Sequence, residues 1–167
     1  MADITLAPAI RPAAPEDLPR LLEIYAAARA YMAAHGNPGQ WAGGYPEPEL
    51  LMQDIRQGQL YVCQYGAQVH AAFVLAFGPD PTYACIRQGR WPHDGPYATI
   101  HRLASDGSVH GVGRAVVDWC AGRAAVLRAD THENNRTMQQ LLARCGFSYC
   151  GIIQVADGTP RLAYQRG

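Results

Sequence analysis

Two glycines separated by one residue mark a change from a strand-like to a helix-like pattern. Residues 97–104 are apolar and rich in strand-forming types, and apolar residues recur at helical spacing from Val112 onward. Gly111 and Gly113 therefore lie at the predicted helix start. A helix start presents unpaired N–H groups and a positive dipole end, and a missing Cβ lets an anion come close. The turn is a candidate anion site, although the same motif also serves tight packing.

Side chains near this turn could move protons. His101 lies on the strand that precedes the turn, and an imidazole can accept a proton near neutral pH. His101 could equally be hydrogen-bonded within the sheet, because alternation along a strand does not show which face it occupies. Asp106 and His132 are alternative bases, and each also suits a turn or a helix cap.

The charged residues exclude several classes of function. Fourteen basic and fourteen acidic residues give a formal net charge of zero, and all of the basic residues are arginine. Without lysine, neither a Walker-type phosphate loop nor a pyridoxal Schiff base can form. A neutral chain also lacks the basic stripe that a nucleic-acid partner requires, and nothing indicates an anionic membrane partner.

The size and composition of the chain predict one domain over residues 1–167. A hydrophobic content of 49% is enough for a core. The five cysteines are irregularly spaced and match no zinc pattern, so we expect reduced thiols and no metal. The first residues do not resemble a signal peptide, and no segment reaches membrane-spanning length, so a cytoplasmic location is expected.

The order of the predicted elements indicates an α/β (α+β) fold. The expected elements are a strand at 9–11, a helix from 15 to 35, a helix at 49–57, strands at 60–65, 69–77 and 97–104, a helical stripe at 112–120, a strand at 126–130, a helical stripe at 138–145, and strands at 147–155 and 161–164. Such an order predicts a mixed sheet with helices on both faces.

The segments 97–114 and 127–151 together resemble the GNAT superfamily of N-acetyltransferases. In that superfamily a strand leads into a turn of pattern Gln/Arg-x-x-Gly-x-Gly/Ala, and a later helix opens with Asn-x-x-Ala and ends in Gly-Phe. Here residues 111–113 match the turn, Asn135 and Met138 stand at the Asn-x-x-Ala positions, and residues 146–147 are the closing Gly-Phe.

The resemblance covers nearly the whole chain, since residues 10–25 look like the first strand and helix of the superfamily. It is closest to small bacterial members. The residues that carry this closer likeness are Gln40-Trp41, Tyr45-Pro46, Ile100-His101-Arg102, Gly151-Ile152-Ile153 and Arg161 to Tyr164.

The resemblance implies a mostly antiparallel sheet that splays at the cofactor site, and an acetyl group transferred from acetyl-CoA to a primary amine by direct attack. The amine would belong to a small molecule or a peptide N-terminus. His101 would act as the general base and Tyr149 as the general acid. Trp41 and Tyr45 would form walls of the substrate site. The implied cofactor-binding residues are Leu103, Ala104, Ser105, Ser108, Val109, His110, Gly111, Val112, Gly113, Arg114, Asn135 and Met138.

Two positions depart from the pattern of the superfamily. Ser108 stands where the turn usually has Gln or Arg, and Leu142 stands where many members place the tyrosine that protonates the departing thiolate. The second departure keeps an alternative open, in which the chain is an acyl-CoA-binding module with impaired catalysis. The sequence also leaves open whether the chain forms a homodimer.

Overall fold

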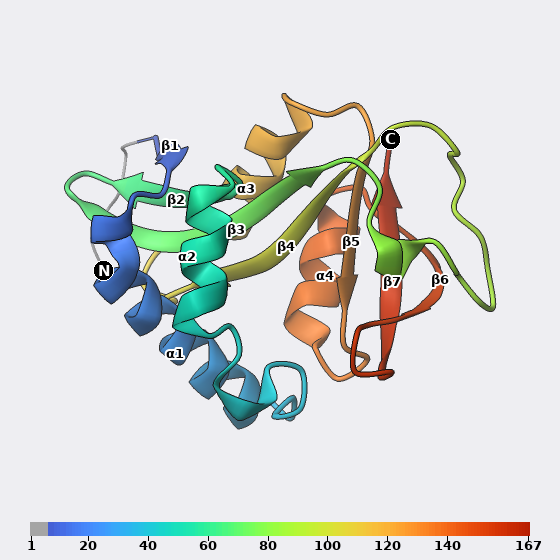
Figure 1. Ribbon diagram of the computed structural model, residues 1–167, viewed down its shortest axis with the longest axis horizontal. Coiled ribbons are helices and arrows are strands. Elements are labelled where there is room, and N and C mark those ends of the chain that lie inside the picture. The colour runs from blue at the N-terminus through green and yellow to red at the C-terminus, as the bar shows by residue number, and fades with distance from the viewer. Residues whose placement is uncertain (1–6) are drawn as a thin grey trace.

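The framework of the protein is a twisted seven-stranded sheet, seen in a computed structural model that describes residues 7–167 (Figure 1). The strands lie in the order β1-β2-β3-β4-β5-β7-β6. Their bounds are β1 Ala9–Pro12, β2 Leu60–Tyr65, β3 Gln68–Phe77, β4 Ala98–Ser105, β5 Leu127–Thr131, β6 Ser148–Gln154 and β7 Pro160–Arg166. These bounds confirm the strands predicted from the sequence, with small differences at their ends.

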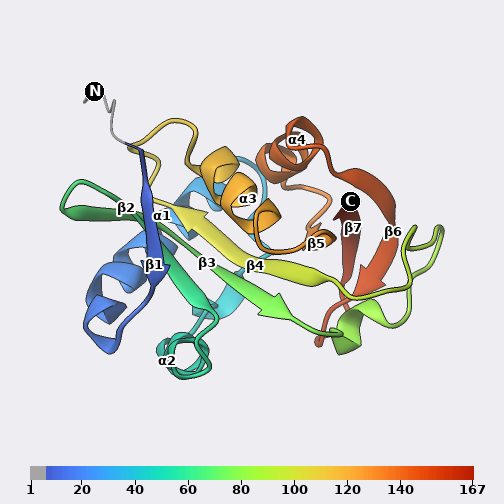
Figure 2. The same cartoon turned by 90° about the horizontal axis from the view of Figure 1, so that it is seen from above.

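Helices cover both faces of the sheet, as the sequence predicts (Figure 2). On one face lie α1 (Leu18–Ala34) and α2 (Pro48–Arg56), and on the other lie α3 (Val112–Ala121) and α4 (Arg136–Arg144). The first helix is shorter than predicted, because residues 15–17 form a separate 3-10 turn. Within residues 7–167, no helix combines the length and the hydrophobicity needed to cross a membrane.

Each face of the sheet has its own hydrophobic core. Helix α3 buries Val116 and Cys120 against the face that carries Phe73 and Leu127. On the opposite face, the first two helices pack on β2, β3 and β4. Since alternate residues of a strand point to opposite faces, these three strands contribute to both cores and fix the two helical layers relative to one another.

The sheet opens between β4 and β5, the only parallel neighbours in the described chain. They pair only at Ala98 with Leu127 and at Thr99 with Arg128. Beyond Thr99 the strands diverge, so one backbone edge of residues 100–105 has no strand partner. This arrangement confirms the splayed sheet that the family resemblance implies.

A β-bulge in β4 explains why the strands separate. The register against β3 shifts between Ala72 and Val74, and Arg102 has a left-handed φ of 51°. A bulge increases the local twist and turns a strand away from its neighbour. The Tyr25 hydroxyl donates a 2.7 Å hydrogen bond to the Arg102 carbonyl, and the Arg102 guanidinium lies 2.7 Å from the buried Asp54 carboxylate. The bulge is therefore held from both its backbone and its side chain.

Candidate functional site

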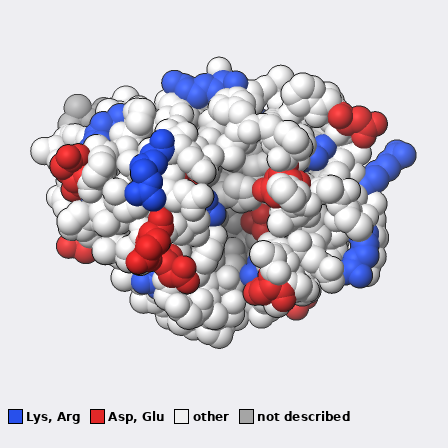
Figure 3. Space-filling model, viewed as in Figure 1, with Lys and Arg blue, Asp and Glu red and all other residues white. Residues whose placement is uncertain are grey.

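A cavity of about 1360 Å³ occupies the opening between β4 and β5. Its walls come from both strands, from α1, α3 and α4, and from the loops that follow α1 and β3. The space-filling view shows a hollow near the centre of the front face, with both acidic and basic side chains around it (Figure 3). The cavity is lined by the start of α3 and also by charged side chains that include Asp80, Asp130 and Arg161.

The start of α3 has the geometry of an anion site. Gly111 is the N-cap residue, with a left-handed φ of 79°. The first bond of the helix runs from Ala115 N to Gly111 O, over 3.0 Å. The N–H groups of residues 112–114 precede this bond and have no intrahelical acceptor. Because a Cβ at Gly111 would meet no atom within 4 Å, this turn faces open space in the cavity.

Gly113 has a different role from Gly111. A Cβ at this position would come within 2.7 Å of Leu141 Cδ2 on α4. The absence of a side chain here lets α3 and α4 approach closely. The sequence left two roles open for the glycine motif, namely an anion site and tight packing. Gly111 fits the first role because it forms the open turn, and Gly113 fits the second.

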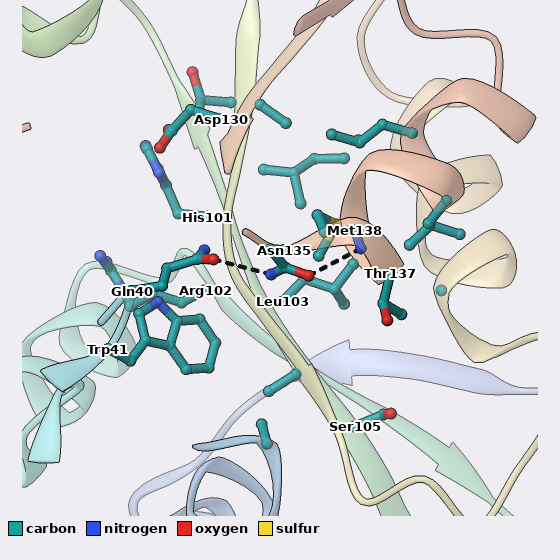
Figure 4. A pocket seen from close by; sticks show the side chains of 18 of the residues that line it. Gln40, Trp41, His101, Arg102, Leu103, Ser105, Asp130, Asn135, Thr137 and Met138 are labelled. Carbon is teal, nitrogen blue, oxygen red and sulfur yellow. Dashed lines mark hydrogen bonds between the residues drawn. The ribbon is translucent and has the colours of Figure 1, made fainter. Parts of the chain in front are cut away.

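Asn135 connects the start of α4 to the loop that follows α1 (Figure 4). Its Oδ1 accepts a 3.0 Å hydrogen bond from Met138 N and caps the helix, while its Nδ2 donates to Gln40 Oε1 over 2.9 Å. Gln40 precedes Trp41, whose ring lies 5.7 Å from the ring of Tyr25. This bridge holds the Trp41 loop across the opening of the sheet.

Tyr45 supports the same wall of the cavity. Its hydroxyl accepts a 3.0 Å hydrogen bond from Arg102 Nη1, and its ring lies 6.4 Å from the ring of Trp41. Both aromatic side chains line the cavity. The Arg102 guanidinium therefore connects the bulge in β4 to the loop that carries Trp41 and Tyr45.

His101 enters the cavity from β4 and is hydrogen-bonded to a carboxylate. Its Nε2 lies 2.9 Å from Asp80 Oδ2. Asp80 Oδ1 accepts from both the backbone N–H and the hydroxyl of Thr82, at 2.9 and 2.8 Å. The hydrogen bond from His101 lowers the pKa of Asp80 to about 2. A carboxylate that is ionised at all ordinary pH values thus fixes one ring nitrogen and leaves Nδ1 for proton exchange.

A second carboxylate, Asp130, reaches the cavity from β5. The Tyr83 hydroxyl donates a 2.6 Å hydrogen bond to Asp130 Oδ1. Burial raises the pKa of Asp130 above its ordinary value, against the opposing effects of Tyr83, His101 and Arg161. Burial also raises the pKa of Tyr83, so this hydroxyl stays a donor. In Figure 4, His101 and Asp130 lie on the same side of the cavity.

Asp130 is expected to destabilise the folded protein at neutral pH. Its folded-state pKa lies above the unfolded value of 3.8, so its stabilising contribution is complete below that pH and is lost as the pH rises through the folded pKa. Asp130→Asn should therefore have a higher Tm than the wild type at pH 7, and the difference should shrink as the pH falls toward 4.

Asp157→Asn is the matched control for this measurement. Asp157 also lines the cavity, but its hydrogen bonds from Thr159 lower its pKa, so its replacement should not raise the Tm at pH 7. A lower Tm for Asp130→Asn at pH 7 would contradict the assigned burial of an ionised carboxylate.

Solved structures with the same architecture identify the family of the chain. An acetyltransferase of the GNAT family from Streptococcus agalactiae is 33% identical and has a TM-score of 0.87, with 95% of this chain and 94% of that chain covered. This chain belongs to the GNAT family of acetyltransferases. The sequence itself matches no protein-family model and no curated protein.

More distant GNAT structures share the fold. An acetyltransferase of the GNAT family from Listeria monocytogenes is 18% identical, with a TM-score of 0.67 and 95% and 94% of the two chains covered. AAC(6')-Ib, solved in complex with ribostamycin and coenzyme A, is 16% identical, with a TM-score of 0.65, and 96% of this chain and 93% of that chain are covered. At these identities the likeness concerns the fold alone.

Most of the GNAT site residues expected from the sequence lie around the one cavity. They are Trp41, Tyr45, His101, Leu103, Ala104, Ser105, Val109, His110, Gly111, Val112, Gly113, Arg114, Asn135 and Met138. Of the two alternative bases, Asp106 also lines this cavity and His132 does not, and both are engaged in other contacts. Asp106 pairs with Arg20 at 2.6 Å and with His70 at 2.8 Å, and His132 Nδ1 accepts from Asn134 N.

The structure does not bring two of the expected residues to the cavity wall. Tyr149 is 52% exposed and packs edge-on against Tyr164. Ser108 is exposed, and its hydroxyl bonds to Asp106 Oδ1 at 2.6 Å. At the position of the usual GNAT tyrosine, Leu142 is buried in the core between α4 and the sheet. Tyr149, the residue expected to protonate the thiolate, is therefore not part of the cavity wall.

The sequence reasoning missed Asp80, Asp130 and Tyr83. Asp80 and Tyr83 fall in the irregular stretch after β3, where no periodic pattern indicates which side chains turn inward. Asp130 carried a signal, because it stands at the carboxyl end of a predicted buried strand, and ligands of open sheets bind at such ends.

Proposed function

We propose that this GNAT protein transfers an acetyl group from acetyl-CoA to a primary amine. The observation that supports the proposal is one cavity that joins the open turn at Gly111 to the His101–Asp80 pair along the free edge of β4. One end of this cavity suits an anion, the middle suits an extended chain with amide groups, and the other end holds a proton acceptor.

The residues of the cavity fit acetyl-CoA along its length. The N–H groups of residues 112–114 bind the pyrophosphate, with the Arg114 guanidinium nearby as a countercharge. The backbone of Leu103 to Ser105 pairs with the pantetheine amides, as a free strand edge pairs with an extended ligand. Acetyl-CoA supplies a thioester carbonyl as the electrophile. AAC(6')-Ib has the same fold and was solved with coenzyme A, which supports a coenzyme A thioester as the cosubstrate.

His101 acts as the general base. A primary amine has a pKa of about 10.4 and is mostly protonated at neutral pH, so it must lose a proton before or during its attack. The free amine attacks the thioester carbonyl, the C–N bond forms, and the C–S bond breaks. His101 Nδ1 accepts the proton, and Asp80 stabilises the resulting imidazolium at 2.9 Å. Asp80 is thus a positioning residue for the base.

The thiolate leaves without a side-chain acid. Leu142 cannot donate a proton, and Tyr149 lies away from the cavity. A thiol has a pKa near 8.5, so its thiolate is a competent leaving group near neutral pH. The alternative function, an acyl-CoA-binding module with impaired catalysis, is favoured by the same buried Leu142.

Acetyl-CoA is expected to stabilise the protein, and a primary amine is expected to release free CoA. At about 100 times the Kd, binding adds about 2.7 kcal/mol of stability. For 167 residues this corresponds to a rise of about 5–10 °C in Tm. Thermal unfolding with and without acetyl-CoA measures the first effect, and thiol release with a panel of amines measures the second.

The two measurements separate the candidate functions. Stabilisation together with CoA release supports acyl transfer. Stabilisation without release from any amine would favour the binding module, and an unchanged Tm would contradict both functions.

A further inference from the structure

Arg161 is a buried cation on the wall of the cavity. It is 7% exposed, and it reaches the cavity from β7. Its Nη1 donates to Thr159 Oγ1 and to the Pro160 carbonyl at 3.0 and 2.9 Å, and its Nη2 donates to the Gln40 carbonyl at 3.4 Å. All of these acceptors are neutral.

In the described part of the chain Arg161 forms no salt bridge, and its charge acts on the Asp130 and Asp157 carboxyl groups only at longer range, where it lowers the pKa of both. Within residues 7–167, no carboxylate lies within the 4.0 Å of a salt bridge to this guanidinium. The two other buried or mostly buried arginines near the sheet opening differ. Arg102 pairs with Asp54 at 2.7 Å, and Arg128 stacks over the rings of Trp91 and Tyr97 at 4.1 and 3.9 Å. A buried guanidinium without a countercharge is costly, and an anionic ligand would remove that cost.

The strand register places Arg161 beside Asp130. Asp130 pairs with Ala163, and Arg161 lies two positions before Ala163, on the same face of the sheet. Such diagonal neighbours on adjacent strands lie about 7–8 Å apart. No salt bridge joins these two residues, and Asp130 Oδ1 instead accepts a hydrogen bond from the Tyr83 hydroxyl. A positive and a negative group therefore stand side by side at the cavity and interact at longer range, although neither forms a direct ion pair with the other.

Thr99 adds an unsatisfied polar group to this region. It is 1% exposed and lines the cavity from β4, and its Oγ1 has no hydrogen-bond partner in residues 7–167. Its side chain points to the same face as those of His101 and Asp130, because Thr99 pairs with Arg128 and alternate residues share a face. A buried hydroxyl without a partner is expected to bind a polar ligand group.

We propose that the acceptor is a zwitterion, namely a free amino acid. The inference rests on the proposed acyl transfer and names its substrate class. The carboxylate of the amino acid pairs with Arg161, and its ammonium group is held by Asp130 before His101 removes the proton. A simple amine would leave Arg161 without a countercharge, and a peptide N-terminus carries an amide where the carboxylate should lie.

Matched sets of acceptors test this inference. Each free amino acid is compared with its carboxamide and with the amine that lacks the carboxyl group, and CoA release gives kcat/KM for each. For the preferred amino acid, kcat/KM should exceed that of the carboxamide by about 100-fold, because the carboxamide leaves the buried guanidinium unpaired. The comparison uses the wild-type protein, so it does not depend on the folding of a variant.

Arg161→Gln links the preference to this residue. Glutamine can still donate to the Pro160 carbonyl, but it carries no charge. The ratio of kcat/KM for the acid over the carboxamide should fall from about 100 to near 1. Arg166→Gln, on the same strand with a distant 3.9 Å contact to Asp118, should keep the wild-type ratio.

The outcomes distinguish this inference from the proposed function. Equal turnover of acids, carboxamides and simple amines would overturn the zwitterion inference while acyl transfer stands. An unchanged ratio in Arg161→Gln would overturn the role of Arg161. Release of CoA from no acceptor, together with stabilisation by acetyl-CoA, would overturn acyl transfer and the inference together.

Discussion

Replacing His101 with alanine is expected to lower kcat by about 100-fold or more while the Kd for acetyl-CoA changes little. A positioned general base typically contributes about 100- to 10,000-fold to a rate. His101 is hydrogen-bonded to Asp80 and lies on the same side of the cavity as Asp130 (Figure 4), and it is not part of the glycine turn at the start of α3. Steady-state CoA release and titration with acetyl-CoA measure the two quantities. Unchanged turnover in this variant would remove His101 from the mechanism.

The pH dependence of the variant separates a base from a structural residue. As the pH approaches the pKa of the amine, about 10.4 for an alkyl ammonium group, the substrate deprotonates in solution and needs no base. The defect of His101→Ala should therefore shrink as the pH rises. His70→Ala is the matched control, because His70 also pairs with a carboxylate, Asp106, at 2.8 Å. A defect of constant size at every pH would indicate a structural role.

Replacing Gly111 with valine is expected to weaken acetyl-CoA binding by at least about 100-fold, because the proposed pyrophosphate site depends on direct contact with backbone N–H groups. A Cβ at Gly111 meets nothing within 4 Å, so the new side chain would occupy the open space beside the turn where the pyrophosphate is proposed to bind. The left-handed φ of 79° is also unfavourable for a β-branched residue. Titration calorimetry or the stabilisation by acetyl-CoA measures the loss.

Gly66→Val controls for the backbone strain. Gly66 has a comparable φ of 62° in the turn between β2 and β3, and a Cβ there would also meet nothing within 4 Å. Both variants should lose about 1–2 kcal/mol of stability from the left-handed conformation. Only the Gly111 variant should lose affinity for acetyl-CoA. Full affinity in Gly111→Val would place the cofactor elsewhere.

The elements of the fold were predictable because their signals are local. Val112, Val116 and Cys120 repeat at helical spacing, and burial of this stripe against the sheet is the reason that α3 forms where it does. The hairpin of β2 and β3 was visible from two apolar strands separated by a short turn. The shorter first helix was not predicted, since a proline followed by acidic residues, as in Pro15-Glu16-Asp17, fits both a 3-10 turn and a helix start.

The cofactor end of the site was more predictable than the acceptor end. Gly111 and Asn135 stand at helix starts. Helix starts favour particular residue types at the N-cap, so these positions can be recognised in the sequence. Tyr149 shows the limit of that approach, because its exposed place beside Tyr164 depends on the packing of β6 on β7. The spacing of residues along the chain does not predict how two strands pack on each other.

The sequence by itself determined the strands, the helices, the glycine turn at Gly111 and the resemblance to GNAT acetyltransferases. Only the tertiary structure decided which polar groups meet at the acceptor end. Asp80 comes from a loop, Asp130 from β5 and Arg161 from β7, and they converge because of the β5–β7 register and the bulge at Arg102. Pairing between distant strands depends on the whole sheet, and no local period in the chain encodes it.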